Sequence, residues 1–153
     1  MCFFLRKKHY FCAKYTAMPS YQVTYLPTQV VMSIKASDMQ LGIPTAFAKL
    51  EMVLPSLKGR HFYGACRCVG TALEYWACVA PFVDTEFELY GLEPFMLPEG
   101  KYAYCKLLNW AEQVTKIKHV FMDMENYFAH DSSRPQIEDY RSQNELVLYL
   151  PIL

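Results

Sequence analysis

The amino-acid sequence predicts an α+β fold in which a strand–helix–strand–strand unit occurs twice. The first observation behind this prediction is an internal repeat, in which the apolar pattern of residues 21–84 returns over residues 89–153. The shift is 71 positions without a gap, so that Leu26-Pro27 returns as Leu97-Pro98. The second observation is that each copy has one stretch of helical apolar spacing among stretches rich in β-branched and aromatic residues. Two such units predict a mostly antiparallel sheet with two helices on one face and a central cleft between them.

In the first copy, residues 22–36 are rich in valine, isoleucine, threonine and tyrosine, which predicts a strand. Leu26-Pro27 predicts a bend in this strand, because proline has no N–H to donate to a sheet. Between Gly42 and Pro55, apolar residues recur at steps of three and four, which predicts a helix that the second proline ends. A hairpin follows, with strands expected at 61–69 and 74–83.

The second copy repeats this order after an acidic joint at 84–88. Residues 92–108 predict a long opening strand that is again broken, at Pro98 and Gly100. Apolar residues from 114 to 128 step by three and four, which predicts a helix with one buried stripe. The chain then closes with a hairpin, whose strands are expected at 136–140 and 145–153.

Charge is unevenly spread in this chain, whose net charge is zero. Residues 1–17 hold four basic residues and no acid, which leaves 11 basic and 15 acidic residues for the rest. A mildly acidic body argues against a nucleic-acid surface, and no stretch has the length and apolar character of a membrane span. Residues 1–20 are expected to be an N-terminal extension of a single domain at 21–153. This extension is an extra edge strand, a basic arm, or a reading-frame extension ahead of a start at Met18.

The six cysteines and four histidines do not follow a metal-binding pattern. Cys66 and Cys68 are the only close cysteine pair and the histidines are scattered, whereas zinc sites favour paired C-x-x-C spacings. No phosphate-binding loop and no Ser-His-Asp order is found in the sequence either. We therefore expect neither a metal nor a cofactor, and we expect the cysteines to be free thiols of a cytoplasmic protein.

Three motifs of the second copy follow one another in a set order. They are Leu97-Pro98-Glu99-Gly100-Lys101-Tyr102-Ala103, then Ile137-Glu138-x-Tyr140, then a closing apolar strand from Glu145 to Ile152. These motifs resemble the I-P-x-G-x-Y-A strand, the acidic strand and the closing strand of the GyrI-like effector-binding domains. That family includes drug-sensing C-terminal domains of AraC-type and MerR-type transcription regulators, and stand-alone proteins such as the gyrase inhibitory protein. The resemblance covers residues 21–153.

The resemblance implies the duplicated fold and a cleft that takes bulky, planar or hydrophobic compounds, often cationic. It also implies a ligand-contacting glutamate in the acidic strand, and this role falls to Glu138. The physical chemistry agrees, because a carboxylate in apolar surroundings is costly and a bound cation removes that cost. Aromatic rings around it add cation–π attraction of about 0.5–2 kcal/mol each. The high aromatic share of 16% indicates either such a ring-lined pocket or a two-sided aromatic core.

Each candidate residue has a structural alternative. Glu138 either contacts a ligand or forms a salt bridge with Arg67, onto which the repeat maps it. Trp110 either caps the cleft or is a half-buried loop aromatic. The strand tyrosines either line the cleft or belong to the core or the exposed sheet, and period-two alternation places Glu138 and Tyr140 on one face. The candidate ligand-binding residues are Glu138, Trp110, Tyr102, Tyr104, Tyr140 and Tyr149, with Phe47 and Trp76 from the first copy.

These observations predict a stand-alone binding module for hydrophobic, often cationic, small molecules, used in sensing or sequestration. Residues 1–20 are too few for the helix-turn-helix reader that the regulators carry, so we expect no direct nucleic-acid binding and no membrane partner. Two alternatives stay open at this stage. One is a small-molecule hydrolase in which Glu138 acts as general base or electrostatic stabiliser. The other is a protein-interaction role like that of a gyrase inhibitor.

Overall fold

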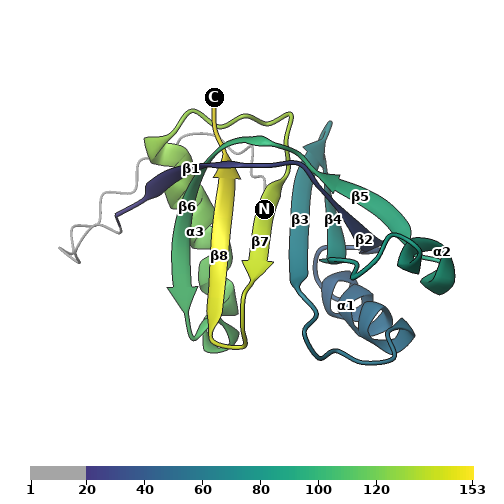
Figure 1. Ribbon diagram of the computed structural model, residues 1–153. Helices are drawn as coiled ribbons and strands as arrows, with labels where there is room; N and C mark the ends of the chain where they lie inside the picture. Colours follow the sequence, from purple (N-terminus) through teal and green to yellow (C-terminus); the bar gives the residue numbers. More distant parts are fainter. Residues whose placement is uncertain (1–19) are drawn as a thin grey trace.

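The structure, a computed structural model, describes residues 20–153, so the expected N-terminal extension lies outside the described residues apart from Ser20. The described chain forms one eight-stranded antiparallel sheet in the order β1-β6-β8-β7-β3-β4-β2-β5 (Figure 1). The duplicated α+β architecture is confirmed. The strands are β1 (Gln22–Leu26), β2 (Gln29–Lys35), β3 (Phe62–Val69), β4 (Ala72–Val79), β5 (Glu93–Leu97), β6 (Gly100–Leu108), β7 (Gln136–Tyr140) and β8 (Glu145–Pro151). The helices are α1 (Gly42–Val53), α2 (Glu86–Tyr90) and α3 (Val114–Tyr127), with a 3-10 turn η1 (Trp110–Glu112).

Each half of the sheet is completed by a strand from the other half. β1 precedes β2 in the chain but pairs with β6, and β5 precedes β6 but pairs with β2 (Figure 1). The single long strands expected at 22–36 and 92–108 are therefore each two strands, and this prediction is corrected. The breaks lie at Pro27 and Pro98, where the missing N–H prevents the ladder from continuing.

Both long helices cover the same face of the sheet and span the predicted segments. α1 packs on β2 and β4, and α3 packs on β8. α1 buries Ala46 and Leu50, and α3 buries their repeat counterparts Ile117 and Phe121. This agreement between the copies is what the shared apolar register predicts. Among residues 20–153, no helix is long and apolar enough to cross a membrane.

The short helix α2 lies where the sequence predicts only an acidic joint. Its first residue, Glu86, is buried and receives two hydrogen bonds from the guanidinium of Arg60, at 2.7 and 2.8 Å. The N–H of Phe82 donates a third, at 2.8 Å. The joint is therefore fixed by a buried ion pair to the segment that precedes β3.

The face of the sheet opposite α1 and α3, which we call the concave face, carries an aromatic core. The sheet curls, and the β1–β2 and β5–β6 segments cross over one another's halves at its upper edge (Figure 1). The buried side chains of this face come from both halves of the chain. They include Val31, Tyr63, Trp76, Leu97, Tyr102, Ile137, Val147 and Tyr149.

The repeat contains compensating gaps that the sequence does not reveal. Ala77 and Leu148 are counterparts under the shift of 71 positions, and their cross-strand partners are Gly64 and Glu138. The structural counterpart of Glu138 is therefore Gly64, and the predicted equivalence of Glu138 with Arg67 is wrong. Gly64 follows Leu50 by 14 positions, whereas Glu138 follows the counterpart Phe121 by 17. Ala77 follows Gly64 by 13 positions and Leu148 follows Glu138 by 10, so the two three-residue differences cancel and the register recovers by β8.

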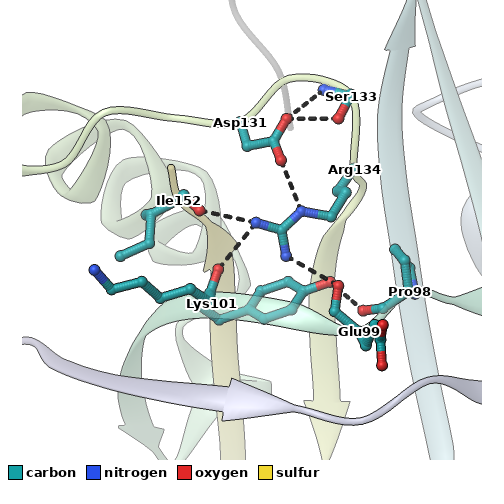
Figure 2. A network of polar contacts seen from close by, with 8 residues as sticks. Pro98, Glu99, Lys101, Asp131, Ser133, Arg134 and Ile152 are labelled. Carbon is teal, nitrogen blue, oxygen red and sulfur yellow. Dashed lines mark hydrogen bonds and ion pairs between the residues drawn. The ribbon is translucent and has the colours of Figure 1, made fainter.

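Arg134, in the loop before β7, joins three segments beside the β5–β6 bend (Figure 2). Its Nε donates to the carboxylate of Asp131 at 2.8 Å. Its Nη2 donates to the carbonyl oxygens of Lys101 at 3.1 Å and Ile152 at 2.8 Å. The guanidinium also lies 4.7 Å from the centre of the Tyr102 ring. Arg134 therefore ties the loop before β7 to β6 and to the C-terminal end of the chain.

Replacing Gly100 with alanine should lower the free energy of unfolding by about 2 kcal/mol. Gly100 has a φ of 141°, and an added Cβ would lie 2.2 Å from Nη1 of Arg134, which its partners hold in place. Urea denaturation measures the loss. The control is Gly70→Ala, whose φ of 64° carries backbone strain but whose surroundings are open, and we expect about 1 kcal/mol there. Equal losses in the two variants would contradict the role of Arg134.

Candidate functional site

Glu138 lies at the centre of the sheet, on the face that the helices cover. In β7 it has Gly64 of β3 and Leu148 of β8 as cross-strand neighbours. Leu148 belongs to the core under α3, and Gly64 lies beside Ala77, which belongs to the core under α1. The side chain of Glu138 is therefore directed into the cleft between the two helices, where the halves of the molecule meet.

Two tyrosines anchor the carboxylate of Glu138. The hydroxyls of Tyr75 and Tyr140 both donate to its Oε2, each at 2.6 Å. Burial, and then the neighbouring charge of Glu138, raises the pKa of both phenols well above its usual value, so both stay protonated as donors. Oε1 has no hydrogen-bond partner among residues 20–153. One oxygen is thus fixed by the protein, and the other keeps its capacity to accept hydrogen bonds.

Gly64 provides the space for this arrangement. A Cβ at this position would lie 2.0 Å from the hydroxyl oxygen of Tyr75 and 2.6 Å from Oε2 of Glu138. Any larger residue would separate the phenol from the carboxylate. The counterpart positions 64 and 138 therefore have complementary roles: the second copy provides the carboxylate of Glu138, and the first provides Gly64, whose missing side chain leaves space for it.

Aromatic rings surround the carboxylate and its two phenols. The ring of Phe47, from α1, meets Tyr75 and Tyr140 edge-on, with centroids 6.2 and 5.7 Å apart. The ring of Trp110, from η1, meets Tyr140 edge-on at 5.0 Å. The indole N–H of Trp110 donates to the carbonyl of Ser142 at 3.0 Å, which fixes the ring's position beside the cleft.

A hollow of about 590 Å³ opens beside these rings. Its walls come from α1, η1, the start of β3 and the loop between β7 and β8, and they include the rings of Phe47, Trp110 and Tyr140. Arg60 and Arg141 also border the hollow, and their charges are paired with Glu86 and Asp139. Glu138 is not itself part of the wall, but it accepts the hydroxyl of Tyr140, which is. Within residues 20–153, no three histidine, cysteine, aspartate or glutamate side chains are grouped as metal ligands. The site therefore offers a partly exposed carboxylate next to an aromatic hollow.

Solved structures of known proteins share this arrangement of strands and helices. The chain is similar to an integron cassette protein from the mobile metagenome of Vibrio cholerae, at 15% identity and a TM-score of 0.62, over 87% of this chain and 95% of that chain. It is similar to SAV2435 bound to tetraphenylphosphonium, at 13% identity and a TM-score of 0.62, over 88% and 94%. It is also similar to the C-terminal domain of EcmrR, at 9% identity and a TM-score of 0.61, over 89% and 98%. The chain has the fold of the GyrI-like effector-binding domains.

This similarity concerns the GyrI-like fold alone, because the identities are low. No protein-family model and no curated protein sequence matches the chain. The roles of individual residues in this GyrI-like fold therefore have to be argued from its own contacts.

The GyrI-like fold brings four of the eight candidate residues together and separates the other four from them. Glu138, Tyr140, Phe47 and Trp110 lie in or beside the cleft. Alternation along the strands directs the others to the concave face, on the far side of the sheet from the Glu138 carboxylate. These are Tyr102 and Tyr104, whose rings both contact that of Tyr149, Tyr149 itself, and Trp76, which packs on Phe95.

The alternative role for Glu138, a salt bridge with Arg67, is wrong. Arg67 lies on the concave face, with its guanidinium 4.7 Å from the centre of the Trp76 ring. Its Nε contacts the carboxylate of Glu74 at 3.5 Å. The positive charge of Arg67 is therefore held on the opposite side of the sheet. The Glu138 carboxylate in the cleft is hydrogen-bonded by Tyr75 and Tyr140 instead.

Tyr75 and Gly64 are functional candidates that sequence reasoning missed. Tyr75 lies within a segment predicted as a strand, but its direction depends on how β3 and β4 pair. The sequence does offer one indication: alternation places Tyr75 on the same face as the apolar Ala77 and Val79, which belong to the core under α1. Nothing in the sequence marks Gly64 as a neighbour of Glu138, because the repeat without gaps makes Arg67 the counterpart of Glu138. Only the three-residue displacement of β7 in the structure reveals Gly64 as that counterpart.

Proposed function

We propose that this protein binds hydrophobic organic cations in the cleft between α1 and α3, for sensing or for sequestration. The observation that carries the proposal is the Glu138 carboxylate, which Tyr75 and Tyr140 anchor through one oxygen at the edge of an aromatic hollow. The remaining oxygen, Oε1, is the acceptor that a ligand cation would approach. The rings of Phe47 and Trp110 are the surfaces on which its apolar parts would lie.

The physics of the site favours a cation over a neutral ligand. Two O–H donors stabilise the negative charge of Glu138, but they are neutral, and among residues 20–153 the nearby Arg60 and Arg141 form their ion pairs with Glu86 and Asp139 and not with Glu138. A carboxylate beside aromatic rings has lost part of its hydration, so an opposite charge gains more there than in water. Each ring that faces the cation adds about 0.5–2 kcal/mol. A delocalised organic cation uses both effects and loses little hydration itself.

The size and walls of the hollow favour a bulky ligand. About 590 Å³ lies within the range of pockets that hold drug-sized molecules, roughly 300–1,000 Å³. Such walls recognise shape loosely, because stacking and apolar contact need few directional partners. Glu138 does not line the hollow itself, so contact between a ligand and Oε1 requires a local shift of the side chains between them. The cleft is thus suited to a class of compounds more than to a single one.

SAV2435 offers chemical support for this choice of ligand. That protein has the same fold and was solved with tetraphenylphosphonium, a bulky aromatic cation. The ligand combines a delocalised positive charge with four apolar rings, which is the combination that a carboxylate among aromatic side chains would favour. The proposal for the present chain rests on its own Glu138, and the likeness in fold adds a precedent.

Rhodamine 6G, a fluorescent hydrophobic cation, tests the proposal by anisotropy titration. Wild type should bind it with a dissociation constant of about 1 μM, or roughly −8 kcal/mol. Glu138→Gln keeps the shape of the side chain and removes the charge, so its affinity should fall about tenfold or more, at about 1.4 kcal/mol per factor of ten. The control Glu99→Gln removes an exposed carboxylate at the β5–β6 bend and should bind like wild type. Equal affinity of Glu138→Gln and wild type would overturn the charge argument.

A further inference from the structure

A second cavity lies on the concave face, across the sheet from the Glu138 cleft. Its volume is about 220 Å³, and both halves of the chain contribute to its walls. The two Leu-Pro bends, Leu26-Pro27 and Leu97-Pro98, form one side, and residues of β3, β7 and β8 form the other. The duplication thus places the two Leu-Pro bends, one from each copy, over the middle strands β7 and β3.

Asp139 organises the polar part of this cavity. Its side chain is directed to the concave face and the residue is only 5% exposed. One carboxylate oxygen contacts Nε2 of His61, and the other accepts a hydrogen bond from Nε of Arg141 at 3.2 Å. A buried carboxylate is tolerated when it is paired and hydrogen-bonded in this way. Asp139 therefore acts as the group that holds Arg141 and His61 in position.

Arg141 borders the cavity and keeps unused donors. A guanidinium has five N–H groups, and the described contacts use two, to Asp139 and, from Nη2, to the hydroxyl oxygen of Tyr149 at 3.1 Å. Its side chain is 47% exposed and lines the cavity. Because Tyr149 accepts from Arg141, its own O–H is also left to donate. The hydrogen-bonding groups that Arg141 and Tyr149 leave unused are donors, which is what a carboxylate requires.

Flat, mostly apolar surfaces complete the cavity. The ring of His61 stacks on Tyr63 with centroids 4.5 Å apart and planes at 12°. Pro27, Pro98 and Ile137 add apolar wall. The volume is smaller than the roughly 300–1,000 Å³ of pockets for drug-sized ligands. The shape and walls fit one small planar body with a single anionic group.

We propose that the concave face carries a second binding site, for a small aromatic or planar carboxylate, whose anionic group is bound by Arg141 and Tyr149. This site differs from the proposed cation cleft in position and in the charge of its ligand. Glu138 and Asp139 are neighbours in β7, yet alternation directs them to opposite faces, so each acid organises its own site. Arg141 borders both cavities, but its hydrogen bonds go to Asp139 and Tyr149 and not to the Glu138 carboxylate. The two sites are therefore told apart by Tyr149→Phe and Glu138→Gln, each of which changes one site only.

Benzoate tests this proposal on the full chain by titration with two-dimensional amide NMR. We expect saturable shifts that centre on Tyr63, Asp139 and Tyr149, with a dissociation constant of about 1 mM. Arg141→Lys keeps the positive charge but loses the paired N–H donors with which a guanidinium binds both oxygens of a carboxylate. Tyr149→Phe removes one donor without changing the charge. We expect the first to weaken binding about tenfold and the second severalfold. Glu138→Gln should bind benzoate like wild type, so this test stands apart from that of the cation cleft.

Two matched controls decide the outcome. Arg67 is the structural counterpart of Arg141 and lies on the same face over Trp76, so Arg67→Lys should leave benzoate binding unchanged. Benzamide has the shape of benzoate without its charge and should bind about tenfold more weakly. The proposal is overturned if benzoate gives no saturable shifts, if the shifts centre on Phe47 and Trp110, if Arg141→Lys binds as well as wild type, or if benzamide binds as well as benzoate.

Discussion

Replacing Arg60 with methionine should lower the free energy of unfolding by about 4 kcal/mol at neutral pH, because it leaves the Glu86 carboxylate buried without its partner. The side chains of Arg60 and Glu86 are only 3% and 8% exposed, and two hydrogen bonds of 2.8 and 2.7 Å join them. The guanidinium also lies 3.8 Å from the centre of the Phe82 ring. The variant therefore loses packing as well as charge. Urea denaturation followed by circular dichroism measures the change.

A matched control separates this buried pair from ordinary surface ion pairs. Lys35 contacts Glu74 at 2.6 Å, but its side chain is 53% exposed, so Lys35→Met should cost less than about 1 kcal/mol. The double variant Arg60→Met with Glu86→Gln should recover part of the loss, because it removes the unpaired charge. A loss in Arg60→Met as small as that in Lys35→Met would show that the Arg60–Glu86 pair does not anchor α2.

The contribution of Glu86 should also depend on pH with a defined sign. The hydrogen bonds from Arg60, followed by that from the Phe82 N–H, hold the pKa of Glu86 at about 2, below its usual 4.5. A carboxylate with a lowered pKa stabilises the folded state above its unfolded value and loses that contribution as the pH falls toward its folded value. The stability difference between wild type and Glu86→Gln should therefore be constant above about pH 5 and shrink between about pH 4.5 and pH 2. A constant difference over this range would contradict the assignment.

Gly64→Ala is the other substitution with a large expected effect, a loss of about 3 kcal/mol in the free energy of unfolding together with a loss of cation binding. The added methyl group would lie 2.0 Å from the Tyr75 hydroxyl and 2.6 Å from Oε2 of Glu138, so either the phenol or the carboxylate must move. Thermal unfolding measures the first effect and rhodamine 6G titration the second.

A second substitution checks the cause of this loss. Tyr75→Phe removes the shortest of the three close contacts, at 2.0 Å, and leaves those to its own Cζ at 2.7 Å and to Oε2 of Glu138 at 2.6 Å. The pair Gly64→Ala with Tyr75→Phe should therefore recover part of the stability that Gly64→Ala alone loses. Tyr75→Phe in the otherwise wild-type chain should be mildly destabilising, because Glu138 loses one of its two donors. If the two substitutions simply add their separate losses, the steric explanation fails.

The elements of the fold were predictable because each has a local cause. Ala46 and Leu50 repeat as Ile117 and Phe121, and this apolar period alone marks both helices. The exchange of β1 and β5 between the halves was not predictable, because a proline at 27 or 98 marks a break but does not name the next pairing partner. α2 escaped prediction for a related reason. In the sequence Glu86 resembles any exposed acidic residue, because its partner Arg60 is 26 residues earlier and no local pattern pairs the two.

The candidate site was predictable only in part. The motif around Glu138 and Tyr140 identified the carboxylate and one of its phenols, since alternation fixes that the two share a face. Tyr102, Tyr104 and Tyr149 lie on the other face because they alternate with Ala103, Leu148 and Leu150, which belong to the core under α3. Alternation along one strand does not say which of its two faces the helices cover, so their placement could not be predicted. The supposed opposition of Arg67 and Glu138 came from the gapless alignment of the two copies. Tyr75 and Gly64 belong to the site only through pairing across β3, which no local pattern encodes.

The central claim, that the cleft recognises positive charge through Glu138, is tested most directly by two ligands of similar bulk. Tetraphenylphosphonium is a cation, and triphenylphosphine oxide has similar aromatic rings without a net charge. Isothermal titration of both into wild type and Glu138→Gln gives four affinities. We predict that the variant loses about tenfold for the cation and keeps its affinity for the neutral ligand. Equal losses for both ligands, or no loss for either, would contradict the claim.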